Sequence, residues 1–175
     1  LVTGASMGLG RASALALAEA GYHVIAVARA KGALEKLDDE ILAKTGQNAT
    51  LVPMDLKDGP ALDRLGAAIF ERWQKLDAFL ACAATLGGSL SPVPHYAPRT
   101  VEEVVAVNFT ANARLIRSLD PLLRTSEAGR AVFVTSGRGI EPKAYWGPYA
   151  ATKAALESLV LCYADEIRPS NLRVN

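Results

Sequence analysis

Apolar residues along this 175-residue chain alternate between two kinds of pattern. Short, nearly continuous apolar runs are typical of strands buried in a parallel sheet, and stretches with apolar residues three and four positions apart are typical of amphipathic helices. The runs predict strands at 1–3, 22–28, 50–53, 77–81 and 132–135, and a sixth that begins at Leu172. The stretches between them predict helices at 11–20, 32–44, 60–75, 100–126 and 149–167.

Strands that alternate with helices in this way predict an α/β fold, a Rossmann-type doubly wound parallel sheet in a three-layer α/β/α arrangement. The fourth run, 77–81, is apolar enough to be buried on both faces. Pro121 is expected to kink the long fourth helix, and the Gly- and Pro-rich stretch 85–98 is expected to be a loop.

The chain begins without Met, inside the first strand, and stops as the sixth begins. We therefore expect one domain, 1–175, as a fragment truncated at both ends.

Composition and charge exclude several classes of function. Half of the residues are hydrophobic, and 19 Lys and Arg against 18 Asp and Glu leave a net charge of +1, so no basic field points to nucleic acid. No apolar run reaches the ~18–20 residues that a membrane span needs. Cys82 and Cys162 have no metal-ligand spacing and fit two reduced thiols in a cytoplasmic protein, and no metal is expected.

A glycine-rich turn joins the first strand to the first helix. Gly4 permits a tight turn, Gly8 lets the backbone approach a diphosphate, and Gly10 lets the helix pack closely on the strand. The free N–H groups at the helix start favour an anion, and Ser6 can add a hydroxyl donor. The sequence therefore predicts a dinucleotide site, the alternative being a plain strand-to-helix turn with incidental glycines.

The end of the second strand bears on the choice of cofactor. An acidic residue there would hold the ribose 2′-hydroxyl of NAD, whereas an arginine accommodates the 2′-phosphate of NADP. The chain has Ala28 and Arg29, which predicts NADP, with NAD possible; the alternative is a solvated loop arginine. Asp55 follows the third strand and is expected to face the same crevice.

Tyr149 and Lys153 lie four positions apart on the last predicted helix, so both side chains can point into one cleft. A lysine ammonium favours the phenolate form of a neighbouring tyrosine, which makes the pair a proton donor and acceptor usable near neutral pH. A Tyr and a Lys at this spacing also occur as ordinary surface pairs.

The motifs together resemble the short-chain dehydrogenase/reductase family. They are Thr3-Gly4-x-x-x-Gly8-x-Gly10, then Asn108 in Val107-Asn108-Phe109, then Ser136, then Tyr149-x-x-x-Lys153, and they cover the whole chain in order. The run Ala144-Tyr145-Trp146-Gly147-Pro148-Tyr149 is similar to a bacterial subgroup of generic oxidoreductases.

The resemblance implies hydride transfer between NADP(H) and a carbonyl or secondary alcohol. Tyr149 would be the general acid/base, Lys153 would assist it and bind the nicotinamide ribose, Ser136 would orient the carbonyl, and Asn108 would hold a water that links Lys153 to solvent. Asn108 could instead brace the helix backbone, and Ser136 could be a plain loop hydroxyl. The expected cofactor contacts are Gly4, Ser6, Met7, Gly8, Leu9, Gly10, Arg29, Asp55, Leu56, Ala83, Tyr149 and Lys153.

One stretch departs from the family pattern. After the fourth strand the family usually has Asn-Asn-Ala-Gly, and this chain has Ala81-Cys82-Ala83-Ala84, so a methyl at Ala84 stands where close backbone approach is expected. A non-catalytic dinucleotide-binding sensor or scaffold therefore stays open, and an epimerase or dehydratase is a weaker alternative. The resemblance also implies a homodimer or homotetramer and a C-terminal substrate region that this chain lacks.

Overall fold

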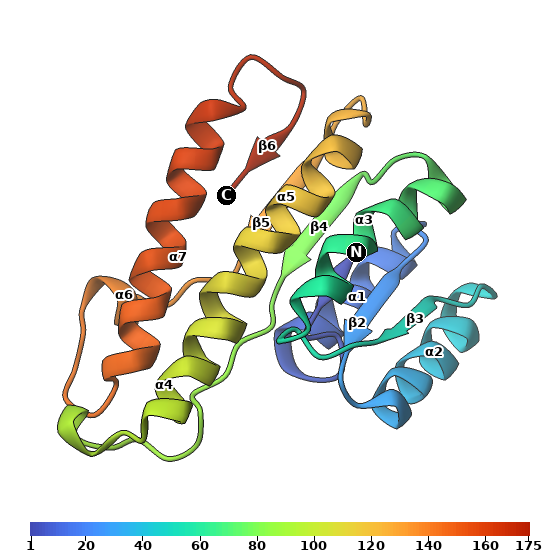
Figure 1. The fold of residues 1–175 in the computed structure, drawn as a ribbon. Coiled ribbons are helices and arrows are strands. Elements are labelled where there is room, and N and C mark those ends of the chain that lie inside the picture. The colour runs from blue at the N-terminus through green and yellow to red at the C-terminus, as the bar shows by residue number, and fades with distance from the viewer.

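The computed structural model describes residues 1–175 and contains one parallel sheet of six strands in the order β3-β2-β1-β4-β5-β6 (Figure 1). Val2 pairs with Ala26 on one side and with Leu80 on the other, so the strand order reverses between β1 and β4. Ligands of such sheets bind at this reversal, beyond the carboxyl ends of the strands. The strands are β1 Val2–Thr3, β2 Ile25–Ala28, β3 Thr50–Pro53, β4 Ala78–Ala81, β5 Arg130–Phe133 and β6 Arg173–Val174.

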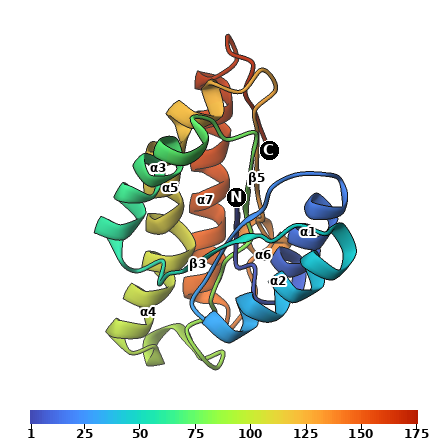
Figure 2. The ribbon, with the colours of Figure 1, turned by 90° about the vertical axis from the view of Figure 1, so that its right-hand side faces the viewer.

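Helices cover the sheet from two sides (Figure 2). On one side lie α1 (Gly8–Glu19) and α2 (Lys31–Thr45). On the other side lie α3 (Gly59–Trp73), α4 (Pro98–Val105), α5 (Ala111–Arg124) and α7 (Gly147–Glu166). Three short elements complete the chain: the 3₁₀ turn η1 (Val93–His95), the π-helical turn η2 (Ala106–Thr110) and α6 (Gly137–Ile140).

Two apolar clusters form the core, one on each face of the sheet. The larger, of 22 buried residues, joins Phe79 and Phe133 of the sheet to α3, α5 and α7, and the smaller, of 10, joins Val2 and Ala26 to α1 and α2. Each helix buries one stripe of apolar side chains, as Leu34, Leu37 and Ile41 do on α2. The three-layer α/β/α arrangement predicted from the alternating patterns is therefore confirmed.

Local signals explain several helix boundaries. The Asp58 carboxylate accepts a hydrogen bond from the Ala61 N–H at the start of α3, and Pro60 follows within the first turn, where its missing N–H costs nothing. Helix α2 ends at Gly46, which has a φ of 71° and so takes the left-handed conformation that glycine adopts without strain.

The predicted helix 100–126 differs from the observed structure in its interior. Helix α5 continues through Pro121 to Arg124, and the irregularity lies at η2, where the Ala111 N–H donates to the carbonyl of Ala106 five residues earlier. Such π-helical turns insert one extra residue into a helix and occur often at functional sites. Asn108 lies in the middle of this turn.

One further expectation needs correction. Strand β4 buries Phe79 and Ala81 against the α5 side, but Ala78 and Leu80 on its other face are only partly buried. The apolar composition of β4 therefore overstated its burial. The loop before Tyr149 contains the single turn of α6, which Ser136 caps by accepting a hydrogen bond from the Arg138 N–H.

None of the helices combines the length and the apolar character that a membrane crossing requires.

Candidate functional site

The glycine turn between β1 and α1 has the geometry that a bound diphosphate needs. Gly4 and Gly8 have φ values of 68° and 54°, and a Cβ on Gly10 would lie 2.3 Å from the carbonyl oxygen of Gly4. Only glycine fits Gly10 without moving α1 away from β1. A Cβ on Gly8 would meet nothing within 4 Å, so this backbone is open to an approaching ligand.

The N-terminus of α1 lacks a protein partner for its first N–H groups. Its N-cap residue, Met7, makes no side-chain capping bond, and the first turn carries no acidic residue. The helix dipole and the free N–H donors together favour an anion at this position.

A cavity of about 350 Å³ opens beside this turn, at the carboxyl ends of the first four strands. Its walls include every residue of the predicted dinucleotide site apart from Tyr149 and Lys153. These lining residues are Gly4, Ser6, Met7, Gly8, Leu9, Gly10, Arg29, Asp55, Leu56 and Ala83. The fold thus brings together residues from four separate loops, as the position of each after a strand predicted.

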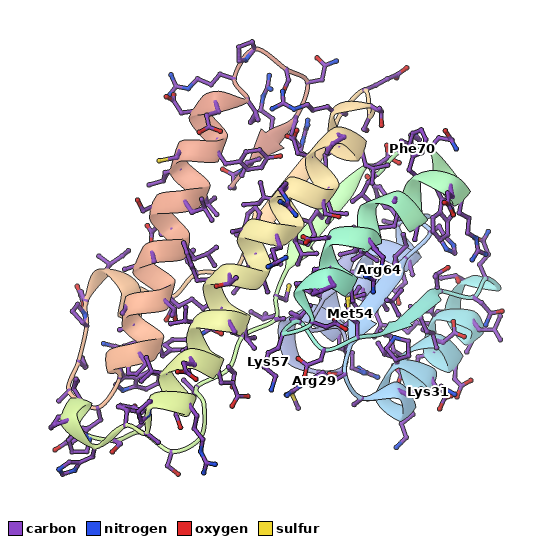
Figure 3. All side chains as sticks on the ribbon, in the orientation of Figure 1. Arg29, Lys31, Met54, Lys57, Arg64 and Phe70 are labelled. Carbon is purple, nitrogen blue, oxygen red and sulfur yellow. The ribbon has the colours of Figure 1, made fainter.

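Arg29 and Met54 lie at the ends of the neighbouring strands β2 and β3, on the wall farthest from α7 (Figure 3). The Arg29 side chain is exposed and makes no ion pair with the protein. The Asp55 carboxylate is held by its own loop, because its Oδ1 accepts a hydrogen bond of 2.9 Å from the Lys57 N–H. A free guanidinium at this wall is available to an anionic group of a ligand.

Tyr149 and Lys153 lie one turn apart near the start of α7. Lys153 is only 2% exposed, its Nζ donates a hydrogen bond of 2.6 Å to the carbonyl of Val134 after β5, and it lies 5.9 Å from the centre of the Tyr149 ring. The Tyr149 ring is partly buried and meets Trp146 edge-on, with 5.7 Å between ring centres. Both side chains are therefore fixed by contacts with the protein.

Lys153 also connects this pair to the nucleotide cavity. Burial lowers the pKa of the Lys153 ammonium below its ordinary range, and the neighbouring Cys82 thiol opposes that shift. Burial likewise raises the pKa of Cys82, opposed by Lys153. Cys82 lines the cavity, so the charge of Lys153 acts on a residue of the cavity wall.

Ser136 lies at the carboxyl end of β5 and begins α6, which packs directly on α7. A Cβ on Gly139 would lie 2.9 Å from the backbone nitrogen of Ala154, so the two helices touch at backbone distance. The Ser136 oxygen accepts the bond from Arg138 and keeps its own proton for another acceptor. Neither Ser136 nor Tyr149 lines the 350 Å³ cavity, so the predicted catalytic hydroxyls lie outside its walls.

Asn108 is fully buried in η2 and uses its whole amide group within the protein. Its Oδ1 accepts from the Thr85 N–H at 2.8 Å, and its Nδ2 donates to the Thr85 carbonyl at 2.9 Å and to Thr152 Oγ1 at 3.1 Å. Its backbone carbonyl accepts from Asn112 Nδ2 at 2.9 Å. The side chain thus acts as a brace, and Oδ1 and the backbone carbonyl oxygen each keep a second lone pair for a water.

Three residues of the stretch that departs from the family pattern, Cys82, Ala83 and Ala84, line the cavity. The Ala83 N–H donates to Thr3 Oγ1 at 3.4 Å, and the backbone of Ala83 would lie 2.9 Å from a Cβ on Gly4. The close backbone approach in this structure is therefore made between Ala83 and Gly4. Ala84 is exposed at the cavity wall, where its methyl group reaches the space for a ligand.

The sequence reasoning missed Thr152, Thr85 and the carbonyl of Val134. Thr152 offered a signal, since it is a polar residue on the same helical stripe as Leu156, Val160 and Tyr163, which are all buried. Backbone carbonyls and loop amides leave no such signal in a sequence.

Comparison with known proteins gives a consistent result. The family model described as short chain dehydrogenase matches residues 1–175. YciK, an uncharacterized oxidoreductase of Escherichia coli K12, is 36% identical over the whole chain, which spans 69% of its length. An NADPH-dependent pterin aldehyde reductase of Arabidopsis thaliana is 32% identical, over 95% of this chain and 68% of the length of that protein. The crystal structure of a short chain dehydrogenase from Shigella flexneri 2a complexed with NADP superposes with a TM-score of 0.94 at 35% identity, covering 99% of this chain and 73% of that one.

Proposed function

Because the chain belongs to the short chain dehydrogenase family, we propose that it is an oxidoreductase that transfers hydride between NADP(H) and a carbonyl or secondary alcohol. The observation that carries this proposal is the buried Lys153, one helical turn from Tyr149 and fixed by the carbonyl of Val134. A buried ammonium is costly, and its retention beside a phenol and a nucleotide cavity supports a role in chemistry. The alternative of a non-catalytic sensor or scaffold is not favoured, since the relatives are named as oxidoreductases and reductases.

The residues of the cavity fit a dinucleotide. The open backbone at Gly8 and the uncapped N-terminus of α1 would bind the diphosphate, and Arg29 would bind the 2′-phosphate. Asp55 and Leu56 would flank the adenine, and Ala83 would border the path toward the nicotinamide. The nicotinamide, when bound, supplies the hydride.

The chain's own contribution to the reaction is the movement of one proton. As hydride arrives at the substrate carbon, negative charge develops on its oxygen, and the Tyr149 hydroxyl would give a proton to that oxygen. The Ser136 hydroxyl would donate a hydrogen bond to the same oxygen, and the Lys153 ammonium would stabilise the phenolate that Tyr149 leaves behind.

The direct test uses the full-length protein. We expect NADPH to be oxidised in the presence of at least one member of a panel of aldehydes, ketones and diketones, with retained binding of NADPH in the absence of substrate. A protein that binds NADPH tightly but oxidises it with no member of the panel would favour the sensor or scaffold.

The choice between NADP and NAD gives a separate prediction. A charge-assisted hydrogen bond from Arg29 to the 2′-phosphate contributes about 1.5–3 kcal/mol, so NADPH should bind roughly ten- to hundred-fold more tightly than NADH. Ala28→Asp combined with Arg29→Ala should reverse or abolish this preference, as measured by the Kd of both cofactors. Lys31→Ala, which removes a nearby charge that pairs with Glu35, is the matched control. Equal binding of NADH and NADPH by the parent would contradict the assignment of Arg29.

We also infer that residues 1–175 act as one nucleotide-binding domain and that the full-length protein is a cytoplasmic homodimer or homotetramer. Val105 on α4 and Leu161 on α7 are 38% and 64% exposed, which supports an interface across these two helices. Light scattering of the full-length protein at micromolar concentration tests the assembly, and a monomer would reject it. Cell fractionation tests the location, which the free thiols Cys82 and Cys162 support.

A further inference from the structure

The residue between Ala151 and Lys153, Thr152, is a polar side chain in the core. It is 4% exposed and lies on the apolar stripe of α7. Its hydroxyl donates a hydrogen bond of 2.9 Å to the backbone carbonyl of Tyr149 and accepts one of 3.1 Å from Asn108 Nδ2. Burial of an unsatisfied hydroxyl is unfavourable, and here both of its hydrogen-bonding functions are used.

This hydroxyl closes a continuous chain of hydrogen bonds that runs from the cavity to the catalytic helix. Thr85, which lines the cavity, is held through both its N–H and its carbonyl by the Asn108 side chain. Asn108 holds Thr152, and Thr152 holds the carbonyl of Tyr149. The three segments that are joined in this way are the loop after β4, the π-helical turn η2 and the start of α7.

The π-helical turn makes this arrangement possible. The extra residue inserted at Ala106–Thr110 shifts the side chains of η2 relative to those of α5. Asn108 then faces both the β4 loop and α7, and no other side chain of η2 bonds to both segments.

We propose that Thr152 is a positioning residue, which sets the placement of Tyr149 relative to the cofactor cavity by joining the Tyr149 carbonyl to Asn108. This inference rests on the proposed oxidoreductase function. In this proposal the Asn108 side chain holds the Thr152 hydroxyl, and that hydroxyl holds the Tyr149 carbonyl. Small displacements of a proton donor from its productive geometry reduce turnover more than they reduce binding.

The first experiment measures the bond network without any reaction. Amide hydrogen exchange is followed in the full-length protein for the peptide that contains Thr85, in the parent, Thr152→Val and Thr152→Ser. Valine keeps the branched shape without the hydroxyl, so the Thr85 amide should exchange roughly ten-fold faster, as the loss of about one hydrogen bond predicts. In Thr152→Ser, which keeps the hydroxyl, the Thr85 amide should exchange at the parental rate.

A matched control separates this network from helix stability in general. The hydroxyl of Thr45 also bonds to a helical carbonyl, that of Ile41 at 2.8 Å, on α2 and outside the cavity. Thr45→Val should leave both the exchange at Thr85 and the rate of NADPH oxidation unchanged. If Thr152→Val fails to fold, Thr152→Ala provides the variant without a hydroxyl.

The second experiment measures turnover with NADPH and one carbonyl substrate. Thr152→Val should lower kcat about ten-fold or more, with KM for NADPH within about two-fold of the parent, and Thr152→Ser should restore kcat. In an Asn108→Ala background, Thr152→Val should lower kcat by less than it does in the parent, because one of the two bonds that it removes, the bond to Asn108, is already absent.

The outcomes distinguish this inference from the proposed function. Unchanged exchange at Thr85 in Thr152→Val overturns the inference whether or not the parent is active. Faster exchange with an unchanged kcat also overturns it, since the network would then be structural only. A parent that oxidises NADPH with no carbonyl, but shows the expected exchange pattern, supports the network and counts against the proposed function.

Discussion

At the scale of single residues, the site depends as much on absent atoms as on present ones. The missing Cβ of Gly10 lets α1 meet the end of β1, and the open backbone of Gly8 faces the cavity. Lys153 shows the reverse case, a charged group in the core whose Nζ is bonded to the carbonyl of Val134. Each of these positions can be tested by one substitution.

Gly10→Ala should damage both stability and cofactor binding. The added methyl would lie 2.3 Å from the Gly4 oxygen, so α1 must shift, at a cost of about 1–3 kcal/mol for an overpacked site. Thermal unfolding and the Kd of NADPH measure the two effects. Gly32→Ala is the control, because its methyl would approach only the flexible end of Glu35, at 4.0 Å, and alanine favours a helix. A Gly10→Ala protein as stable as the parent would contradict the close packing of α1 on β1.

The lowered pKa of the Asp77 carboxyl predicts that the stability of the fold depends on pH. The hydrogen bond from Ser126, 2.6 Å long, is the main cause that lowers the pKa of the Asp77 carboxyl below its ordinary 3.8. The folded state therefore binds this proton more weakly than the unfolded state, and the stabilisation is present above pH 3.8 and is lost as pH falls through the folded pKa. Ser126→Ala should lower the midpoint of urea unfolding at neutral pH, and the difference from the parent should shrink in acid. Ser158→Ala, at an exposed position on α7, is the control.

At the scale of elements, contacts between two loops hold the start of α7. The Tyr96 hydroxyl accepts a hydrogen bond from the Ser91 N–H at 3.2 Å and donates one to the Tyr145 carbonyl at 2.7 Å. Tyr145 has a φ of 74°, a strained value for a residue with a side chain, and Gly147 beside it packs against Val93. Strain of this kind persists only where neighbouring contacts hold it.

Tyr96→Phe removes this bridge and keeps the ring. Both of its hydrogen bonds are lost, and the loss of the one to Tyr145, about 0.5–1.5 kcal/mol, should loosen the start of α7 and lower turnover roughly two- to ten-fold, with NADPH binding retained. Steady-state kinetics of the full-length protein provide the measurement. Tyr22→Phe, at a tyrosine that is 49% exposed and outside this site, should behave as the parent does. Equal kinetics of Tyr96→Phe and the parent would show that Tyr145 is held without this hydroxyl.

The sequence was sufficient for the elements because the apolar periodicity of α2 and the glycine positions of the first turn are local signals. The kink expected at Pro121 also rests on a local signal, since proline is the usual cause of a kink, and it stays a prediction. The observed π-helical turn at Asn108 has no local marker, since it is stabilised by bonds to Thr85 and Thr152. Contacts between segments distant in the chain are what periodicity cannot reveal.

At the scale of the whole molecule, the loops that follow the first five strands lie together at the carboxyl ends of the strands. The reversal of strand order between β1 and β4 opens the nucleotide cavity, and β5 and α7 add Ser136, Tyr149 and Lys153 beside it. Lys153 of α7 and Cys82 of the cavity wall influence each other's pKa through their charges. This arrangement supports the proposal that the first half of the chain binds the cofactor and that the second half donates the proton to the substrate oxygen.

The central claim is that Tyr149 donates the proton to the substrate oxygen during hydride transfer. The measurement is the rate of NADPH oxidation by full-length parent and Tyr149→Phe with the same carbonyl substrate, alongside the Kd of NADPH for both. Phenylalanine keeps the ring that packs on Trp146 and removes the proton. We predict a loss of turnover of about 10²–10⁴-fold with the Kd nearly unchanged. A variant that turns over at the parental rate would show that Tyr149 is not the acid.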